Sequence, residues 1–309
     1  MFDKFVQQRR YYFLFSGALV SLSILLMLVG YFRSGTPFPL SVDFLGGTRF
    51  EVQFSETVTE DQVRQIFIQA DIVNPSLTAL RGADLQNAWQ IRTEFVDEER
   101  TSQLESALRQ LAPLVEGTFS VTRVSPAIGQ EVTRAALTAV VVSAIIILFY
   151  IMFVFRQIPN SFRYGVCAVI AMFHDLFIIF GFAALTGMIL GWEVDALFLT
   201  GVLTVAGFSL QETIIVFDRV RENYSRRRVN SFETLVNRSI AETFKRSMIT
   251  QTSALIVLTS ILIFGGVTIK PFIAVLLVGL LSGSYSSLFV AVPLLVAWHE
   301  GEIPLLRPA

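Results

Sequence analysis

The sequence contains almost no cysteine or histidine, and little charge for its length. Its 309 residues include one cysteine and two histidines, and 16% are charged. The single cysteine, Cys167, excludes an intramolecular disulfide, and two histidines leave little basis for a histidine metal site. The patterns HExxH, GxSxG and the Walker A loop are also absent, so we expect neither an enzyme nor a bound cofactor.

Long hydrophobic runs are abundant instead. Hydrophobic residues make up 53% of the chain, and the mean hydropathy is +0.61. A helix needs about 20 apolar residues to cross the hydrocarbon core of a bilayer. The first run is longer than a signal peptide's and lacks its cleavage pattern, so we interpret it as a retained anchor. The runs predict six membrane helices, at about 12–32, 136–155, 164–186, 196–217, 248–264 and 272–297.

The polar stretch between the first two runs has the pattern of a small folded domain. Alternating segments predict strands at 48–54, 77–81, 89–93 and 118–124. Helices are predicted from the capping box Thr59–Gln62 through Ala70, and at 99–111. This order is that of an α+β ferredoxin-like domain, with both helices on one face of the sheet. The predicted parts are 1–34 (tail and first helix), 35–133 (soluble domain), 134–299 (helices two to six) and 300–309 (tail).

The positive residues predict how the chain crosses the membrane. Cytoplasmic segments carry an excess of Lys and Arg. They gather before the first helix and in two links, at Lys4, Arg9, Arg10, Arg156, Arg163, Arg219, Arg221, Arg226, Arg227, Arg228, Arg238, Lys245 and Arg246. We therefore expect a multi-pass membrane protein with both termini in the cytoplasm and the soluble domain outside.

The fourth hydrophobic run contains a carboxylate, Glu212. An acidic residue near the middle of a membrane helix costs roughly 2.5 to 3.5 kcal/mol, so it usually has a partner and marks an ion or substrate path. Arg246, at the start of the next run, is predicted to lie at a similar depth. Helical spacing extends a polar stripe from Glu212 to Ser209, and another from Arg246 to Thr250 and Ser253. Two interpretations stay open, a proton-carrying pair and a static ion pair.

Two further acidic positions lie in or directly after the hydrophobic runs. Asp218 begins a charged segment, where we expect local pairs among Asp218, Arg219, Arg221 and Glu222, and a proton role for Asp218 is the alternative. His174 and Asp175 lie midway along the third run. Adjacent helical residues point about 100° apart, so we do not expect these two to pair with each other. They serve either an interhelical hydrogen bond or a proton path.

Glycines mark two other segments. Gly46 and Gly47 lead into a strand, which favours a turn over a phosphate cradle. In the sixth run, the small residues from Gly279 through Gly283 to Ser287 recur at four-residue intervals, which is typical of close helix packing.

Three motifs resemble those of the SecF family of protein-export subunits. Val42–Thr48 (VDFLGGT) is similar to the family's DFxGGT motif and includes Asp43, Phe44, Gly46 and Gly47. Ala171–Asp175 (AMFHD) resembles its AxxHD stretch. Gly207–Asn223 (GFSLQETIIVFDRVREN) resembles the signature GYSxNDTxVVxDRxREN, whose last part includes Arg219, Arg221, Glu222 and Asn223. The chain departs from this signature at Gln211 and Glu212, where the family usually has Asn and Asp.

The resemblance implies a fold and a function. The fold is half of a resistance-nodulation-division transporter, a six-helix bundle with one extracytoplasmic domain. The implied partners are SecD, the SecYEG translocon with SecA, a translocating unfolded polypeptide and membrane lipid, without nucleic acid. The implied function is to assist protein export with the proton motive force, with protons as the coupling ion and Glu212 and Arg246 as the proton-linked pair. An efflux half-transporter and a non-transporting translocon scaffold are the alternatives.

Overall fold

The computed structural model describes residues 4–73, 75–82, 85–226 and 231–302. Arg227 and Arg228 of the predicted basic link, and residues 303–309 of the predicted tail, lie outside the described residues. The chain forms two compact units. The helical unit comprises residues 1–38, 138–192 and 197–309, and the sheet unit comprises residues 39–137 and 193–196. The sheet unit thus includes a short segment, 193–196, that the predicted soluble domain does not contain.

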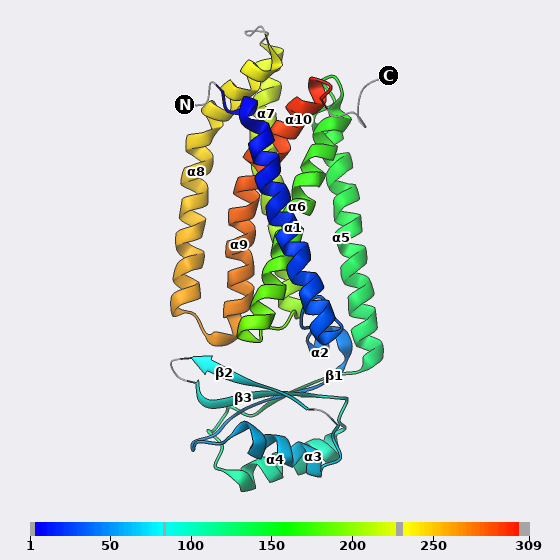
Figure 1. The fold of residues 1–309 in the computed structure, drawn as a ribbon, viewed down its shortest axis with the longest axis vertical. Coiled ribbons are helices and arrows are strands. Elements are labelled where there is room, and N and C mark those ends of the chain that lie inside the picture. The colour runs from blue at the N-terminus through cyan, green and yellow to red at the C-terminus, as the bar shows by residue number, and fades with distance from the viewer. Residues whose placement is uncertain (1–3, 74, 83–84, 227–230, 303–309) are drawn as a thin grey trace. The chain divides into compact units, whose positions relative to one another are not determined.

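Six helices of the described chain are long and apolar enough to span a membrane, as predicted (Figure 1). Each extends past its hydrophobic run, because backbone hydrogen bonding continues through the polar residues at its ends. The last span is interrupted by a π-helix (labelled η3). The bounds are α1 Arg9–Ser34, α5 Pro126–Val154, α6 Ser161–Leu190, α7 Ala196–Ser225, α8 Phe232–Phe264, α9 Lys270–Ser286, η3 Ser287–Ala291 and α10 Val292–His299.

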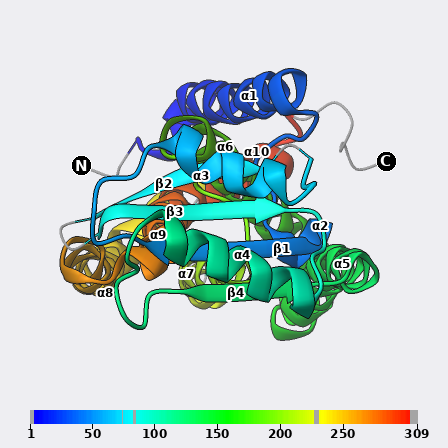
Figure 2. The same ribbon diagram turned by 90° about the horizontal axis from the view of Figure 1, so that it is seen from below.

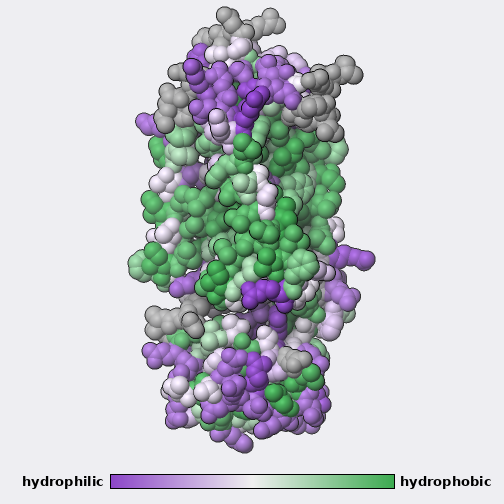
Figure 3. All heavy atoms as spheres, viewed as in Figure 1, coloured by the Kyte–Doolittle hydropathy of each residue, from purple (hydrophilic) through white to green (hydrophobic). Residues whose placement is uncertain are grey.

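Helices α6, α7 and α9 form the interior of the helical unit. The predicted small-residue packing is confirmed, because a Cβ added at Gly279 would overlap Val205 of α7 and one at Gly283 would press on Ser209. Helices α1, α5 and α8 are mostly exposed, and large hydrophobic side chains cover their outer faces. Hydrophobic residues accordingly dominate the face of the bundle in Figure 3. A surface of this kind requires lipid or another membrane helix around it.

The sheet unit has the predicted β-α-β-β-α-β order. Its antiparallel sheet has the strand order β2-β3-β1-β4, as the ferredoxin-like fold requires. Helices α3 and α4 lie over one face of it (Figure 2), and the predicted capping box of Thr59 and Gln62 opens α3. The bounds are α2 Val42–Leu45, β1 Gly47–Gln53, α3 Glu60–Gln69, β2 Ser76–Gly82, β3 Leu85–Thr93, α4 Glu98–Leu111 and β4 Ser120–Val124.

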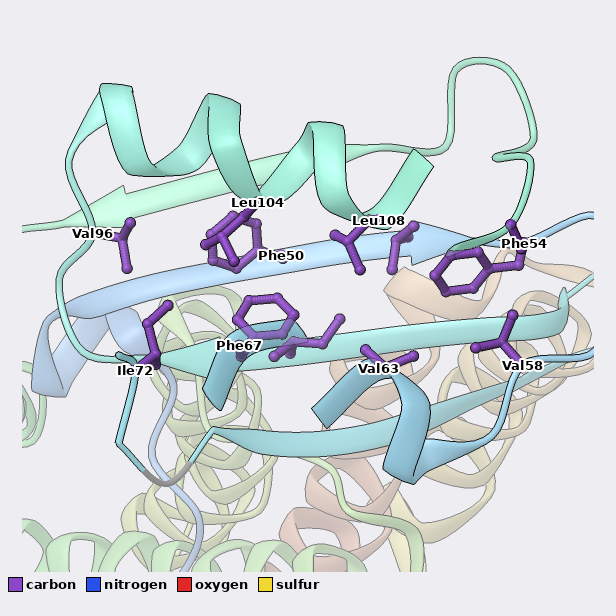
Figure 4. Close-up of a cluster of buried hydrophobic side chains, with 12 residues drawn as sticks. Phe50, Phe54, Val58, Val63, Phe67, Ile72, Val96, Leu104 and Leu108 are labelled. Carbon is purple, nitrogen blue, oxygen red and sulfur yellow. The ribbon is translucent and has the colours of Figure 1, made fainter. Parts of the chain in front are cut away.

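The core of this unit lies between the two helices and the sheet (Figure 4). Phe50 of β1 and Phe67 of α3 are fully buried, and their rings meet edge to face with centroids 5.3 Å apart. Leu104 and Leu108, one turn apart on α4, close the cluster. Alternation along β1 and 3.6-residue periodicity along the helices thus direct one apolar face of each element inward.

The two ends of the described chain meet at one end of the helical unit. Arg9 of α1, 7% exposed, pairs with Glu233 at the start of α8 at 2.7 Å and with Glu302 beyond α10 at 2.5 Å. The backbone N–H of Val6 donates to Asn237 of α8 at 3.0 Å. The Arg9 guanidinium lowers the pKa of the Glu302 carboxyl through its hydrogen bond and its charge.

This lowered pKa predicts a pH-dependent contribution to stability. A carboxyl whose pKa is lowered in the folded state stabilises the fold above its unfolded pKa, and the contribution is lost as the pH falls through the folded value. We expect the wild-type protein to melt at a higher temperature than Glu302→Gln near neutral pH. The difference should shrink below about pH 4.5, the ordinary value. Glu300→Gln, at an exposed neighbouring residue, is the control.

The packing of the sheet unit predicts a large effect at Phe67. We expect Phe67→Ala to destabilise this unit by about 3 to 5 kcal/mol, because truncating a fully buried phenylalanine leaves a cavity. Hydrogen exchange across β1 and α3 in the whole protein measures the effect. Ile68→Ala removes a side chain that is 46% exposed on the same helix, and it should change exchange little.

Candidate functional site

A carboxylate in the middle of the bundle holds three helices together. Asp175 of α6 is 1% exposed. Its Oδ2 accepts hydrogen bonds from Ser209 of α7 at 2.6 Å and Ser286 of α9 at 2.7 Å, and its Oδ1 accepts one from Ser282 of α9 at 2.5 Å. No arginine or lysine among the described residues pairs with it. Interhelical hydrogen bonding, one of the two interpretations from the sequence, is thus present.

The expectation that His174 and Asp175 do not pair is wrong. Nδ1 of His174 lies 3.1 Å from Oδ1 of Asp175. The 100° between neighbouring positions is overcome because the short Asp side chain turns back toward the imidazole nitrogen nearest the backbone. His174 is 7% exposed, and its other nitrogen, Nε2, has no hydrogen-bond partner in the described chain.

A second buried carboxylate, Glu212 of α7, faces α8 one helical turn after Ser209. It is 5% exposed. The polar side chains that face it are Ser247 and Gln251, and the charge of Arg246 also acts on it. The buried Ser247 Oγ and Gln251 Oε1 have no geometrically good hydrogen bond to any described residue.

The structure revises two expectations about α8. Arg246 is exposed and forms no ion pair with Glu212, although its charge acts there. Thr250 and Ser253 are also exposed, and their hydroxyls bond to carbonyls of their own helix. The polar side chains of α8 that face Glu212 are Ser247 and Gln251, which begin one residue after Arg246. Successive residues of a helix point about 100° apart, so the polar face lies about 100° around α8 from the predicted one.

Four residues of the site were not singled out from the sequence. Ser247 and Gln251 are one turn apart on α8, and Ser282 and Ser286 are one turn apart on α9. The signal was present as i, i+4 pairs of polar residues in hydrophobic helices, opposite a buried carboxylate that needs donors. In α9 the small-residue pattern predicted from the sequence consists of Gly279, Gly283 and Ser287, and Ser282 and Ser286 lie between these positions. The segment serves both purposes, since its glycines face α7 and its serines face Asp175.

The charged end of α7 forms local pairs, as predicted. Asp218, whose side chain is 51% exposed, pairs with Arg221 at 2.5 Å, and Arg219 pairs with Glu222. This segment also binds α8, because Asn223 donates to Ser239 and Glu242, both at 2.9 Å, and Arg219 pairs with Glu242. None of these contacts joins Asp218 to Glu212 or Asp175. The structure therefore places Asp218 outside both buried carboxylate sites.

The glycine motif makes a tight turn in the sheet unit. Gly46 and Gly47 both have positive φ, 75° and 124°, and Gly47 begins β1. A Cβ at Gly46 would overlap Pro126, and one at Gly47 would overlap the carbonyl of Thr93. Phe44 is buried beside them and accepts a hydrogen bond from Thr133 at 3.4 Å. Only glycine fits both positions, and a turn into a strand is confirmed.

Asp43 of the same motif holds the segment 193–196, which we call the clip. Its Oδ2 accepts from the backbone N–H of Ala196, the first residue of α7, at 3.1 Å. Val194 pairs with Pro39 and Ser41 through backbone hydrogen bonds of 2.8 and 2.9 Å. Asp43 therefore acts as a helix cap for α7, the helix that carries Glu212.

An ion pair completes the clip. Arg92 of β3 pairs with Glu193 at 3.2 Å and also donates to the carbonyl of Leu40. Burial raises the pKa of the Glu193 carboxyl, and the nearby Arg92 only partly opposes this. The described residues contain no group of three or more His, Cys, Asp or Glu side chains placed to hold a metal ion.

The clip predicts a specific effect at Asp43. We expect Asp43→Ala to weaken the start of α7 by about 1 kcal/mol, because the helix loses a side-chain cap. Asp43→Asn keeps a capping oxygen and should retain most of the stability. Hydrogen exchange at the amides of residues 196–199 measures the difference. Equal protection in the alanine and asparagine variants would contradict a capping role.

Comparisons with known proteins agree with this arrangement. Residues 103–301 match the family described as protein export membrane protein SecD/SecF, C-terminal, and residues 34–58 match the SecD/SecF GG motif. The protein translocase subunit SecF of Anaerolinea thermophila is 39% identical over 269 residues, 85% of each chain.

Longer, fused proteins also match. SecDF of Bacillus subtilis is 34% identical over 97% of this chain. The crystal structure of SecDF from Thermus thermophilus, titled a translocon-associated membrane protein, is 29% identical with a TM-score of 0.79 over 96% of this chain. The chain spans 38% of the length of each of these two proteins. By sequence and fold, the chain belongs to the SecD/SecF family of protein-export membrane proteins.

Proposed function

We propose that this chain is a SecF-type subunit that assists the export of unfolded proteins across a membrane and uses the proton motive force. Its relatives are protein translocase subunits, which are transport proteins. The observation that carries the proton-coupled part is the surroundings of Glu212.

These surroundings suit a carboxyl group that gains and loses a proton. Glu212 is buried in a membrane-spanning helix, where an ionised carboxylate without a paired cation is costly. Gln251 Oε1 and Ser247 Oγ beside it are buried without partners. The neutral acid has an O–H that can donate to one of these oxygens, so protonation would satisfy a group that otherwise lacks a hydrogen bond.

Arg246 supplies the second state of this switch. Ionised Glu212 attracts the guanidinium, which lies one residue from Ser247 on the same helix. Neutral Glu212 no longer attracts the Arg246 guanidinium, and it forms hydrogen bonds with Ser247 and Gln251 instead. Loading and unloading a proton therefore changes which side chains of α8 hold α7, which moves one helix relative to the other.

The energy available is sufficient for such a motion. One charge that crosses 100 mV yields about 2.3 kcal/mol, and each unit of pH difference adds about 1.4 kcal/mol. Helix α7 connects the switch to the sheet unit, because its first residue belongs to the clip that Asp43 holds. In this proposal, movement of α7 draws the outer domain, with a bound segment of polypeptide, from one pose to another.

A second helical bundle is required to complete the transporter. Fused SecDF relatives carry this chain's counterpart and further sequence in one polypeptide, which supports association with SecD. The outer face of α8 exposes Arg246, Thr250, Ser253 and Ser260 within the membrane span. Polar groups facing lipid are costly, so a polar stripe of this kind suits a neighbouring helix. SecD is the partner we assign to it, and SecYEG with SecA are the proposed further partners.

The proposed location is the plasma membrane, with both termini in the cytoplasm and the sheet unit outside. The arginine and lysine distribution supports this orientation. A thylakoid membrane is the second candidate, and the SecF of Synechocystis, 30% identical over 95% of this chain, is a relative in which to compare the two locations.

Glu212→Gln tests the proposal. The amide keeps the size and hydrogen-bonding capacity of the side chain but cannot ionise. We expect an imposed proton gradient to stimulate export into vesicles that carry the wild-type complex, and this stimulation to fall by at least tenfold in the variant. Glu212→Asp, which keeps an ionisable group, should retain much of it.

Two controls separate the alternatives. Asp218→Asn removes an exposed carboxylate from the same helix and should leave export unchanged. Gradient-stimulated export at the wild-type rate in Glu212→Gln would favour a scaffold over a proton-driven subunit. If both variants keep normal export, and the wild-type protein exports small molecules in a proton-dependent way, an efflux half-transporter would be favoured.

A further inference from the structure

The imidazole of His174 has an unused nitrogen in a buried place. Nδ1 lies 3.1 Å from Asp175, but Nε2 is buried without a hydrogen-bond partner in the described chain. The ring of Tyr285 from α9 lies beside it, with centroids 5.9 Å apart. A buried polar atom without a partner is rare and costly, so it calls for an explanation.

While Asp175 is ionised, the hydrogen bonds around it place the imidazole hydrogen of His174 on Nδ1. An ionised carboxylate only accepts hydrogen bonds, and it has about four acceptor positions. Three serine hydroxyls and Nδ1 of His174 occupy them. Nδ1 must therefore carry a hydrogen, which leaves Nε2 of the neutral imidazole as a bare acceptor.

We propose that His174 and Asp175 form a second proton-binding site, in which Nε2 of His174 takes up the proton while Asp175 stays ionised. This deepens the proposed proton-coupled function and depends on it for its role in export. The step forms one N–H bond and breaks no hydrogen bond of Asp175. The pair changes from a net charge of −1 to zero.

Protonation of Asp175 itself is the less favourable alternative. A carboxylic acid O–H on Oδ1 could donate to Nδ1 of His174, but that requires the other imidazole tautomer and leaves the buried pair without the attraction between opposite charges. An imidazolium in direct contact instead gives the buried carboxylate the positive partner that it otherwise lacks, and adjacent opposite charges favour each other's ionised form.

The other groups around the pair do not supply this charge. Helix α7 presents the hydroxyl of Ser209 there, while Glu212 faces α8. Helix α9 presents Ser282, Ser286 and the phenol of Tyr285. Helix α1 contributes the hydroxyl of Ser16, 2.9 Å from the Tyr285 oxygen. Among the described residues, Tyr285 is thus the one other titratable side chain beside the imidazole.

The sequence makes a direct test practical, because it contains only two histidines. NMR of the full-length protein in lipid nanodiscs, with ¹⁵N-labelled histidine, reports the protonation of each ring nitrogen. His299→Gln leaves one histidine and assigns the signals. We expect His174 to show a bare Nε2 and a protonated Nδ1 at high pH, and to gain a proton on Nε2 as the pH falls.

Matched variants define the role of each partner. Asp175→Asn should leave Nε2 without its proton over the pH range in which the wild-type protein takes it up, because the carboxylate is gone. Ser282→Ala removes one donor and no charge, and should preserve the uptake. An Nε2–H form at high pH, or no change at Nε2 between pH 4 and 9, would overturn the proposal.

Glu212→Gln distinguishes this site from the first. It should abolish gradient-stimulated export yet leave the His174 titration intact. If His174 does not change its protonation with pH, and Glu212→Gln still abolishes the stimulation of export, only the second site is refuted. If Glu212→Gln keeps full stimulation of export, and His174 gains a proton as the pH falls, the proposed coupling through Glu212 is refuted. The proton-binding site at His174 and Asp175 is then retained.

Discussion

Burying two carboxylates in a hydrophobic bundle is the constraint on which the helical unit depends. Neither Asp175 nor Glu212 has an arginine or lysine within ion-pair distance among the described residues, and the polar groups that face them are hydroxyls, an imidazole and an amide. Those groups come from neighbouring helices, and their positions fix how the helices pack. Glycines at 279 and 283 let α9 approach α7 closely enough for the serines of α9 to reach Asp175 on α6. The close packing of α9 on α7 is therefore needed for the hydrogen bonds that stabilise Asp175.

The two carboxylates differ in how completely they are satisfied. Asp175 has its hydrogen-bond positions filled by three helices, whereas Glu212 lies beside groups that lack partners. A fully hydrogen-bonded buried network makes its surroundings rigid, and Glu212 has no such network. Within the proposed mechanism, α6 and α9 form the fixed part of the bundle and the α7–α8 contact is the part that moves. The exposure of α8 over most of its membrane span is consistent with this division.

Much of the fold follows from the sequence because it depends on local patterns. Runs of hydrophobic residues determine the six spans, and alternation with the Thr59–Gln62 capping box determines the sheet unit. The site was predicted less well. Glu212, His174 and Asp175 are visible as polar residues in apolar runs, but their partners depend on helix rotation. An error of one residue, as between Arg246 and Ser247, turns a side chain by about 100°. The pairing of adjacent His174 and Asp175 depends on side-chain rotation, which periodicity does not contain.

The clip connects the glycine motif with the helix that carries Glu212. Gly46 and Gly47 bring the backbone of α2 and β1 against Pro126 and Thr93, where no side chain fits. This turn places Asp43 so that its carboxylate caps Ala196. Since Ala196 begins α7 and Glu212 lies on that helix, a rigid helix joins the capped end to the buried carboxylate. A helix transmits displacement along its axis because each turn is hydrogen-bonded to the next. The motif is thus best understood as the attachment of α7 to the sheet unit.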